Sequence, residues 1–213
     1  MRQVVLVAAS GLAREVAATI SRLPDTQVAA VLDDAREVWD RVVGDVSVSG
    51  PIERIDEYPT AGIVICAGKG RSRKAIARRL AERGIGRDRY VSIIDPSVTI
   101  HQTCSIGVGC ILLANVVLTC DVRLGDHTVA MPNATLTHDD TLEAFVTVCA
   151  GVVLGGGVQV NEAAYLGMGA AVRENATVGE CSVLGMGSVL LSDLPANETW
   201  AGVPARPLLA RKP

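Results

Sequence analysis

The second half of the chain places an aliphatic residue at every sixth position, from Ile100 to Leu190 without a gap. Two residues ahead of each lies a second series of mostly small or β-branched residues, from Val98 to Ser188. Neither a helix nor a single strand has this period. A six-residue repeat is typical of a parallel β-helix, in which three short faces form one triangular coil of about 18 residues.

We expect both series to point into this prism, with successive coils pairing at roughly 4.8 Å. Burial of each large residue contributes about 1.5–3 kcal/mol, so this column dominates the stability expected for the chain. The alternative is a β-sandwich, which would need turns every 8–12 residues or so and would break the phase of the repeat. Because the phase is kept, the sequence predicts a β-helix.

The first half has a different character, because residues 1–96 hold fifteen of the twenty Lys and Arg residues. We therefore predict two domains, residues 1–96 and 97–213. In the first, apolar runs at 3–9, 28–32 and 62–68 alternate with helical patterns at 12–23 and 71–84. This order predicts an α/β domain with a small Rossmann-like parallel sheet, whose ligand crevice lies at the carboxyl ends of the strands.

Candidate nucleotide-binding groups follow these strands. Gly11 opens a helix whose N-terminus suits an anion, and Asp33 and Asp34 end the second strand, where carboxylates accept from ribose or base donors. The alternative is that they are ordinary turn residues. Only Gly11 stands where the G-x-G-x-x-G motif requires three glycines, so NAD binding is not expected.

We expect residues 90–95 to form the last strand of this sheet and Pro96 to begin the coils. No Gly/Ser-rich linker separates the halves, so they should keep a fixed angle. After Leu190 the repeat ends in a segment with four prolines, which we expect to cap the open coil.

Composition excludes several functions. A formal net charge of −3, without a basic stripe interleaved with aromatics, argues against nucleic-acid binding. The apolar runs are of strand length and no leader pattern is present, so we expect a cytoplasmic protein without membrane attachment. The six cysteines lack a C-x-x-C pair, and the three histidines fall in different phases of the coil. We expect reduced cysteines and no metal site.

The tetrapeptide THDD, residues 137–140, breaks the pattern of the repeat. Asp140 is the only charged residue among the inward small positions, and it follows His138 and Asp139. A buried carboxylate needs hydrogen-bond partners, and a histidine beside carboxylates is a candidate general base. One coil further on, Gly156 lies in the only triple glycine, where a bare N–H can approach an oxyanion. The alternative for His138 is that it is an ordinary exposed turn residue. A separate alternative for the mechanism is an acyl-thiol route, for which Cys120, one coil earlier, is a possible nucleophile.

The chain resembles the NeuD/PglD-like family, the left-handed β-helix acyltransferases of the sialic acid O-acetyltransferase and UDP-4-amino-sugar N-acetyltransferase type. The resemblance covers essentially the whole chain. It is carried by VLVAASGLAREVA, VLDD, VICAGKGRSRKAI, IDPSVTI, the hexapeptides, THDD, LGGGVQV, LGMGAAV and DLPANETWAGVPARP. It implies a homotrimer with acetyl-CoA in the groove between neighbouring β-helices and a nucleotide sugar held by the first domain.

The resemblance also implies roles for single residues. The general base matches His138 with its acidic neighbour Asp139, and the amide that faces the thioester matches Gly156. Positions expected to contact acetyl-CoA are Thr147, Gly156, Gly157, Met168, Gly169, Met186 and Arg206. Sugar-nucleotide positions are Ser10, Gly11, Leu12, Asp33, Asp34 and Gly68. Further candidates for the coenzyme A phosphates, besides Arg206, are Arg173, Arg211 and Lys212.

The chain departs from the family at three polar positions: Leu12 and Thr147 replace histidines that are common there, and Met131 replaces an asparagine. The function expected is acetyl transfer from acetyl-CoA to an amine, or a hydroxyl, of a nucleotide-linked amino sugar. The alternatives are O-acetylation of sialic acid, transfer to another small acceptor such as a free amine, and a non-catalytic β-helix scaffold that binds a sugar nucleotide.

Overall fold

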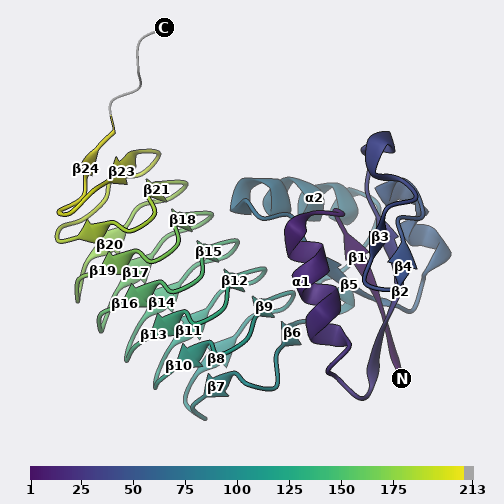
Figure 1. Ribbon diagram of the computed structural model, residues 1–213, viewed down its shortest axis with the longest axis horizontal. Helices are drawn as coiled ribbons and strands as arrows, with labels where there is room; N and C mark the ends of the chain where they lie inside the picture. The colour runs from purple at the N-terminus through teal and green to yellow at the C-terminus, as the bar shows by residue number, and fades with distance from the viewer. Residues whose placement is uncertain (209–213) are drawn as a thin grey trace, which may run out of the picture.

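The computed structural model describes residues 1–208 and shows a small α/β unit beside a β-helix (Figure 1), so the fold class expected from the sequence is confirmed. The α/β unit contains a three-stranded parallel sheet in the order β2-β1-β5. Its elements are β1 (Arg2–Val7), α1 (Gly11–Ile20), β2 (Thr26–Leu32), η1 (Arg36–Val38), β3 (Val42–Val43), β4 (Val46–Ser47), η2 (Ile52–Glu57), β5 (Gly62–Ile65), α2 (Gly70–Glu82) and η3 (Arg87–Arg89).

Alternation along β1 gives this sheet two apolar faces. Val4 and Leu6 pack with α1, whereas Val5 and Val7 pack on the face that receives Leu80 of α2. A parallel sheet covered on both faces needs such continuous apolar runs. The helices follow β1 and β5 directly, so both begin at the carboxyl edge of the sheet.

The β-helix consists of short parallel strands in three sheets. Val117 pairs with Thr135, which lies one 18-residue coil further on. The six-stranded sheet holds β7 (Thr99–Ile100), β10 (Val117–Leu118), β13 (Thr135–Leu136), β16 (Val153–Leu154), β19 (Ala171–Val172) and β22 (Val189–Leu190). The five-stranded sheet holds β8 (Ser105–Ile106), β11 (Arg123–Leu124), β14 (Thr141–Leu142), β17 (Gln159–Val160) and β20 (Thr177–Val178).

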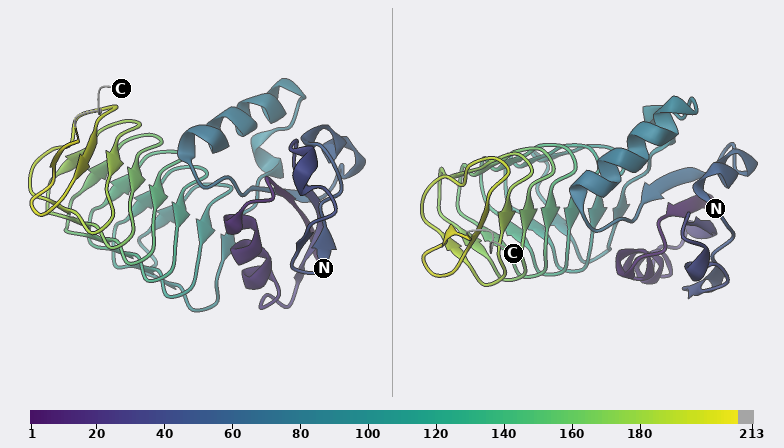
Figure 2. Two further views of the ribbon diagram at one scale, coloured as in Figure 1. Left: turned by 45° about the horizontal axis from the view of Figure 1, so that its top comes forward. Right: turned by 90° about the horizontal axis from the view of Figure 1, so that it is seen from above.

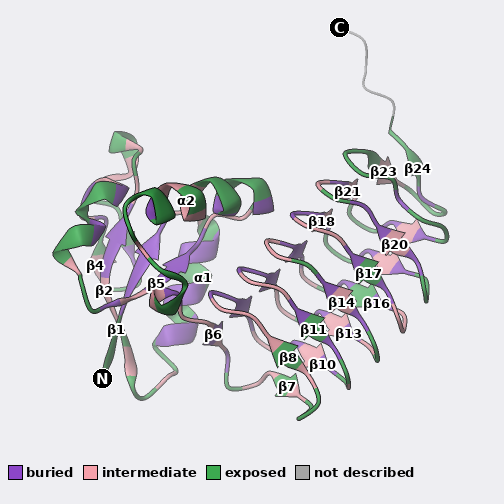
Figure 3. Cartoon of the chain, turned by 180° about the vertical axis from the view of Figure 1, so that it is seen from behind, coloured by how far each residue is buried: buried purple, intermediate pink, exposed green. Residues whose placement is uncertain are grey.

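The eight-stranded sheet holds β6 (Ile93–Ile94), β9 (Ile111–Leu112), β12 (Val129–Ala130), β15 (Thr147–Val148), β18 (Tyr165–Leu166), β21 (Val183–Leu184), β23 (Thr199–Ala201) and β24 (Arg206–Pro207). Both inward series form one buried column, and the buried and exposed segments of each coil alternate in Figure 3. The second residue of each strand, such as Leu136 or Leu154, points inward, and the first points outward.

The junction differs from expectation. Residues 90–95 do not form a strand of the N-terminal sheet, because only Tyr90 bridges to Ile63. Ile93–Ile94 instead form β6, where the N–H of Ile93 donates to the carbonyl of Cys110 at 2.9 Å. Strand pairing of the β-helix therefore starts before residue 97, and the division of the domains at 96 and 97 stays a prediction. The segment after Leu190 adds two more strands: β23 pairs with β21 in parallel, and β24 then turns back antiparallel to β23.

The α/β unit covers part of the eight-stranded sheet. Ile111 and Val129 point outward from that sheet, yet both are buried in the cluster that includes α1. The start of α2 lies against the β-helix, as Figure 2 shows, and a side chain at Gly70 would overlap the backbone of Phe145. This docking surface, besides the absence of a linker, fixes the angle between the two halves.

Candidate active site

An exposed turn between β13 and β14 carries the candidate general base. The His138 side chain is 65 % exposed, and its Nδ1 lies 2.8 Å from Oδ2 of Asp139. Asp139 has a φ of +64°, a left-handed conformation that Asp tolerates better than most residues. The carboxylate engages one ring nitrogen and thereby leaves Nε2 as the nitrogen that can face a substrate.

Gly156 lies directly against this imidazole. A Cβ atom at position 156 would come within 2.9 Å of Nδ1 of His138 and closer still to Cε1 and Nε2. The coils stack in the expected register, because the N–H of Asp139 donates to the carbonyl of Cys120 and that of Gly157 donates to the carbonyl of His138. Cys120, His138 and Gly156 therefore share one edge of the prism. The N–H of Gly156 donates to no group within residues 1–208, which leaves it free to meet an oxyanion.

Asp140 is fully buried beneath this turn. Its Oδ2 accepts the N–H of Thr137 at 2.8 Å, and its Oδ1 accepts the N–H of Val158, in the next coil, at 2.9 Å. Burial raises the pKa of Asp140 from 3.8 to about 7, against the lowering effect of these two N–H groups and of His138. The folded chain thus retains a proton at Asp140 that an unfolded chain releases near pH 4.

Proton retention at Asp140 predicts how stability depends on pH. A raised folded-state pKa stabilises the fold below the unfolded pKa, and this stabilisation is lost as pH rises through the folded value. Between pH 4 and 7, the free energy of unfolding of the wild type relative to Asp140→Asn should fall by about 1.4 kcal/mol per pH unit. Urea unfolding of both proteins at pH 5, 6 and 7 measures this difference. A difference that does not change with pH would contradict the assignment.

The structure corrects one expected acetyl-CoA contact. Thr147 is fully buried, and its hydroxyl donates to the carbonyl of Gly68 and accepts from Arg73. It joins the two halves of the chain and has no surface for a ligand. The sequence could not show this, because an outward position is buried only where another part of the fold covers it.

The other acetyl-CoA positions lie on different edges of the prism. Gly157 follows Gly156 on the edge of His138. Met168, with Gly169, and Met186 are in turns of another edge, and the two methionines are 54 % and 71 % exposed. One chain therefore does not bring Met168 and His138 to the same edge.

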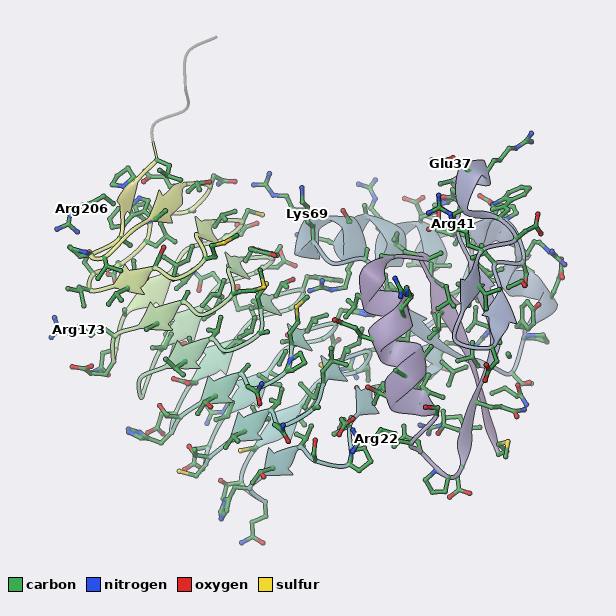
Figure 4. All side chains as sticks on the ribbon, viewed as in Figure 1. Arg22, Glu37, Arg41, Lys69, Arg173 and Arg206 are labelled. Carbon is green, nitrogen blue, oxygen red and sulfur yellow. The ribbon has the colours of Figure 1, made fainter. Side chains whose placement is uncertain are left out.

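The candidate phosphate ligands are exposed. Arg173 lies on the edge of His138, further towards the C-terminus, and pairs with Glu174 at 3.4 Å. Arg206 donates to the carbonyl of Ala205. Both extend from the part of the β-helix that lies away from the α/β unit (Figure 4). Arg211 and Lys212 lie outside the described residues.

Most of the expected nucleotide positions gather at the carboxyl edge of the parallel sheet. Ser10 caps α1 by accepting the N–H of Leu12, and its hydroxyl donates to the carbonyl of Cys66 at 2.5 Å. The carboxylate of Asp33 accepts hydrogen bonds from the N–H groups of Ala9 and Ala35, so it holds the turns that follow β1 and β2. These contacts bring the ends of β1, β2 and β5 together.

Space is open beside positions 11 and 68, because a Cβ atom at Gly11 or Gly68 would meet nothing within 4 Å. Asp34 accepts from the N–H of Ile52 and from Arg79, and these donors lower its pKa against the opposing effect of burial. The expected contact between Leu12 and the nucleotide is wrong, because Leu12, in the first turn of α1, is buried in the core and cannot contact a substrate.

Sequence reasoning missed two residues. Arg73 is fully buried and donates to groups of both halves, but in the sequence it is one of several basic residues in the same helix. Thr137 uses its hydroxyl to donate to the carbonyl of Leu154 in the next coil.

All six cysteines are free thiols. Within residues 1–208, no group of three potential ligands could hold a metal, and no helix is long and apolar enough to cross a membrane.

Comparison with known proteins gives matches in both halves. Residues 3–80 match the family model of the PglD N-terminal domain. UDP-N-acetylbacillosamine N-acetyltransferase of Bacillus subtilis is 31 % identical over 118 residues, which cover 54 % of this chain and 52 % of that protein. Galactoside O-acetyltransferase of Escherichia coli is 28 % identical over 123 residues, covering 53 % and 58 %. The chain thus spans about half the length of the curated relatives that it matches.

Solved structures match over nearly the whole chain. A variant of perosamine N-acetyltransferase from Caulobacter crescentus, in complex with CoA and GDP-perosamine, has a TM-score of 0.89 and 28 % identity, and the match covers 99 % of this chain and 98 % of that one. The acetyltransferase domain of PglB from Neisseria gonorrhoeae, in complex with acetyl coenzyme A, has a TM-score of 0.87 and 28 % identity, with 97 % and 99 % covered.

Proposed function

Because the resemblance to the NeuD/PglD-like acetyltransferases is confirmed, we propose that this chain transfers an acetyl group from acetyl-CoA to the amine of a nucleotide-linked amino sugar. The observation that carries this proposal is that the imidazole of His138 lies against Gly156, which has no side chain, on an exposed edge. Solved relatives in complex with CoA and GDP-perosamine support the two substrate classes.

In the proposed mechanism, Nε2 of His138 accepts a proton from the amine as its nitrogen attacks the thioester carbonyl. Asp139 holds Nδ1 and stabilises the imidazolium that forms. The N–H of Gly156 donates to the developing oxyanion. The carbon–sulfur bond then breaks, and the imidazolium returns its proton to the leaving thiolate.

We propose Ser10, Gly11, Asp33, Asp34 and Gly68 as the surroundings of the nucleotide. Both carboxylates accept hydrogen bonds from the protein, and Asp34, which is the more exposed, is the better candidate for direct contact. A free small amine as acceptor would leave this crevice without a ligand.

Two features support a homotrimer. The outward residues of the six-stranded sheet are uncharged and mostly apolar, and Val153 is among the exposed large hydrophobics. By contrast, Arg123 and Gln159 point outward from the five-stranded sheet. Contact through the apolar sheet would also let Met168 of one copy approach His138 of another, which one chain cannot do. The cytoplasmic location stays a prediction.

The test is transfer from acetyl-CoA to a panel of acceptors. The panel contains UDP-linked and GDP-linked amino sugars, sialic acid and a free small amine, and thiol release is followed in each case. We expect turnover with a nucleotide-linked amino sugar. We also expect calorimetry to show binding of acetyl-CoA and light scattering to show the mass of a trimer. Turnover with sialic acid alone would favour the O-acetyltransferase alternative, for which the galactoside O-acetyltransferase match is an argument. No binding of acetyl-CoA would favour the scaffold.

A further inference from the structure

The β-helix ladder is interrupted on the edge that carries His138. β10 and β13 are joined through two residue pairs, Val117 with Thr135 and Leu118 with Leu136. β13 and β16 are joined only through Thr135 and Val153. Every other pair of coils described between β6 and β22 has two residue pairs. The break therefore requires a local cause.

Asp140 supplies this cause by redirecting one N–H group. One coil earlier, the N–H of Thr119 donates to the carbonyl of Leu136 as the regular ladder requires. The N–H of Thr137 donates instead to Oδ2 of Asp140, and the Thr137 hydroxyl takes its place on the carbonyl of Leu154 at 3.0 Å. A side chain is thus inserted into the ladder, and each main-chain group still has a partner.

Asp140 also couples two turns. Its Oδ1 holds the N–H of Val158, two residues after Gly156. The turn that carries the imidazole and the turn that carries the glycine are therefore bound to the same carboxylate. The equivalent inward positions one coil earlier and one coil later are Val122 and Val158. A valine would fill position 140 without burying a carboxylate, so packing alone does not explain Asp140.

We propose that Asp140 is a positioning residue that, with Thr137, sets the imidazole of His138 against Gly156. It touches no substrate and acts through the main chain of the two turns. This inference rests on the proposed function for its kinetic consequence, but the geometry of the imidazole can be measured without any acceptor. A shift of about 1 Å in a reacting group can lower a rate 10²-fold.

The test compares Asp140→Val and Asp140→Asn with the wild type. Valine should restore the regular ladder and move His138, so we expect kcat to fall about 10- to 100-fold while KM for acetyl-CoA changes less than about 3-fold. Asparagine keeps one acceptor oxygen and should lose less activity. The matched control is Thr119→Val, one coil before Thr137, which should leave kcat unchanged.

A second measurement separates this inference from the function itself. With three histidines in the chain, histidine labelled with ¹³C gives a simple spectrum, in which His138→Ala identifies the His138 signal. We expect Asp140→Val to shift this signal and leave those of His101 and His127 in place. If the wild type acetylates no acceptor, the proposed function fails and this spectrum still decides the inference. An unshifted His138 signal, unchanged kcat, or equal shifts of all three signals would overturn it.

Discussion

Replacement of His138 by alanine is expected to lower kcat/KM for acetyl transfer by about 10²- to 10⁴-fold, the usual contribution of a positioned general base. The reason is that Nε2 of His138 is the proton acceptor that the structure places against Gly156 on this edge. Acetyl-CoA binding should persist, because alanine removes no main-chain group. Steady-state kinetics and calorimetry on the same preparation measure both quantities.

The matched control is His101→Ala, because His101 is also exposed but its Nδ1 faces Thr103 in the first coil. It should keep wild-type kinetics. Gly156→Ala should also lower kcat, as His138→Ala does, because the new Cβ would overlap the imidazole ring and displace it. Cys120→Ser should remain active, and a loss there that matches His138→Ala would favour the acyl-thiol route. An active His138→Ala protein would refute the role of the base.

Replacement of Arg73 by methionine is expected to reduce the free energy of unfolding by about 3–5 kcal/mol. The guanidinium group is fully buried and forms no ion pair within the described residues. It donates to carbonyls on both sides of the domain junction, which are those of Ala67, Gly68, His127, Phe145 and Val146, and to the hydroxyl of Thr147. Methionine fills much of the volume but leaves these acceptors without a donor.

Burial lowers the pKa of Arg73 to about 10, so the guanidinium stays charged at neutral pH. Arg73→Lys, with a charge but no planar fork, should lose an intermediate amount of stability. The matched control is Arg78→Met on the same helix, where the side chain is 83 % exposed and pairs with Glu82. That change should cost less than about 0.5 kcal/mol. Equal unfolding midpoints for Arg73→Met and Arg78→Met would contradict the prediction.

Some features of the site could be predicted because a coil repeats its own geometry. The 18-residue period placed Gly156 above His138 and Cys120 below it, and the structure shows this stack. The same period identified Asp140 as an inward carboxylate, although not its partners. Its bonds to Thr137 and Val158 depend on a local departure from the repeat, which no period can predict.

Contacts between the halves were not predictable in the same way. Thr147 occupies an outward position, like Val129 one coil earlier, and the α/β unit covers both. The outward apolar residues Ile111 and Val129 did not distinguish the covered surface, because outward valines recur on the six-stranded sheet as well. Arg73 gave no signal, since its neighbours in the helix are equally basic.

The sequence by itself determined the β-helix, the alternation of strand and helix before it, and the shared edge of His138 and Gly156. Each of these follows from a period or from residues adjacent in the chain. Tertiary structure alone decided that Thr147 and Leu12 are buried and that Arg73 joins the halves. The physical reason is that these outcomes depend on how two surfaces without a common period dock, and a linear pattern does not encode the orientation of one surface on another.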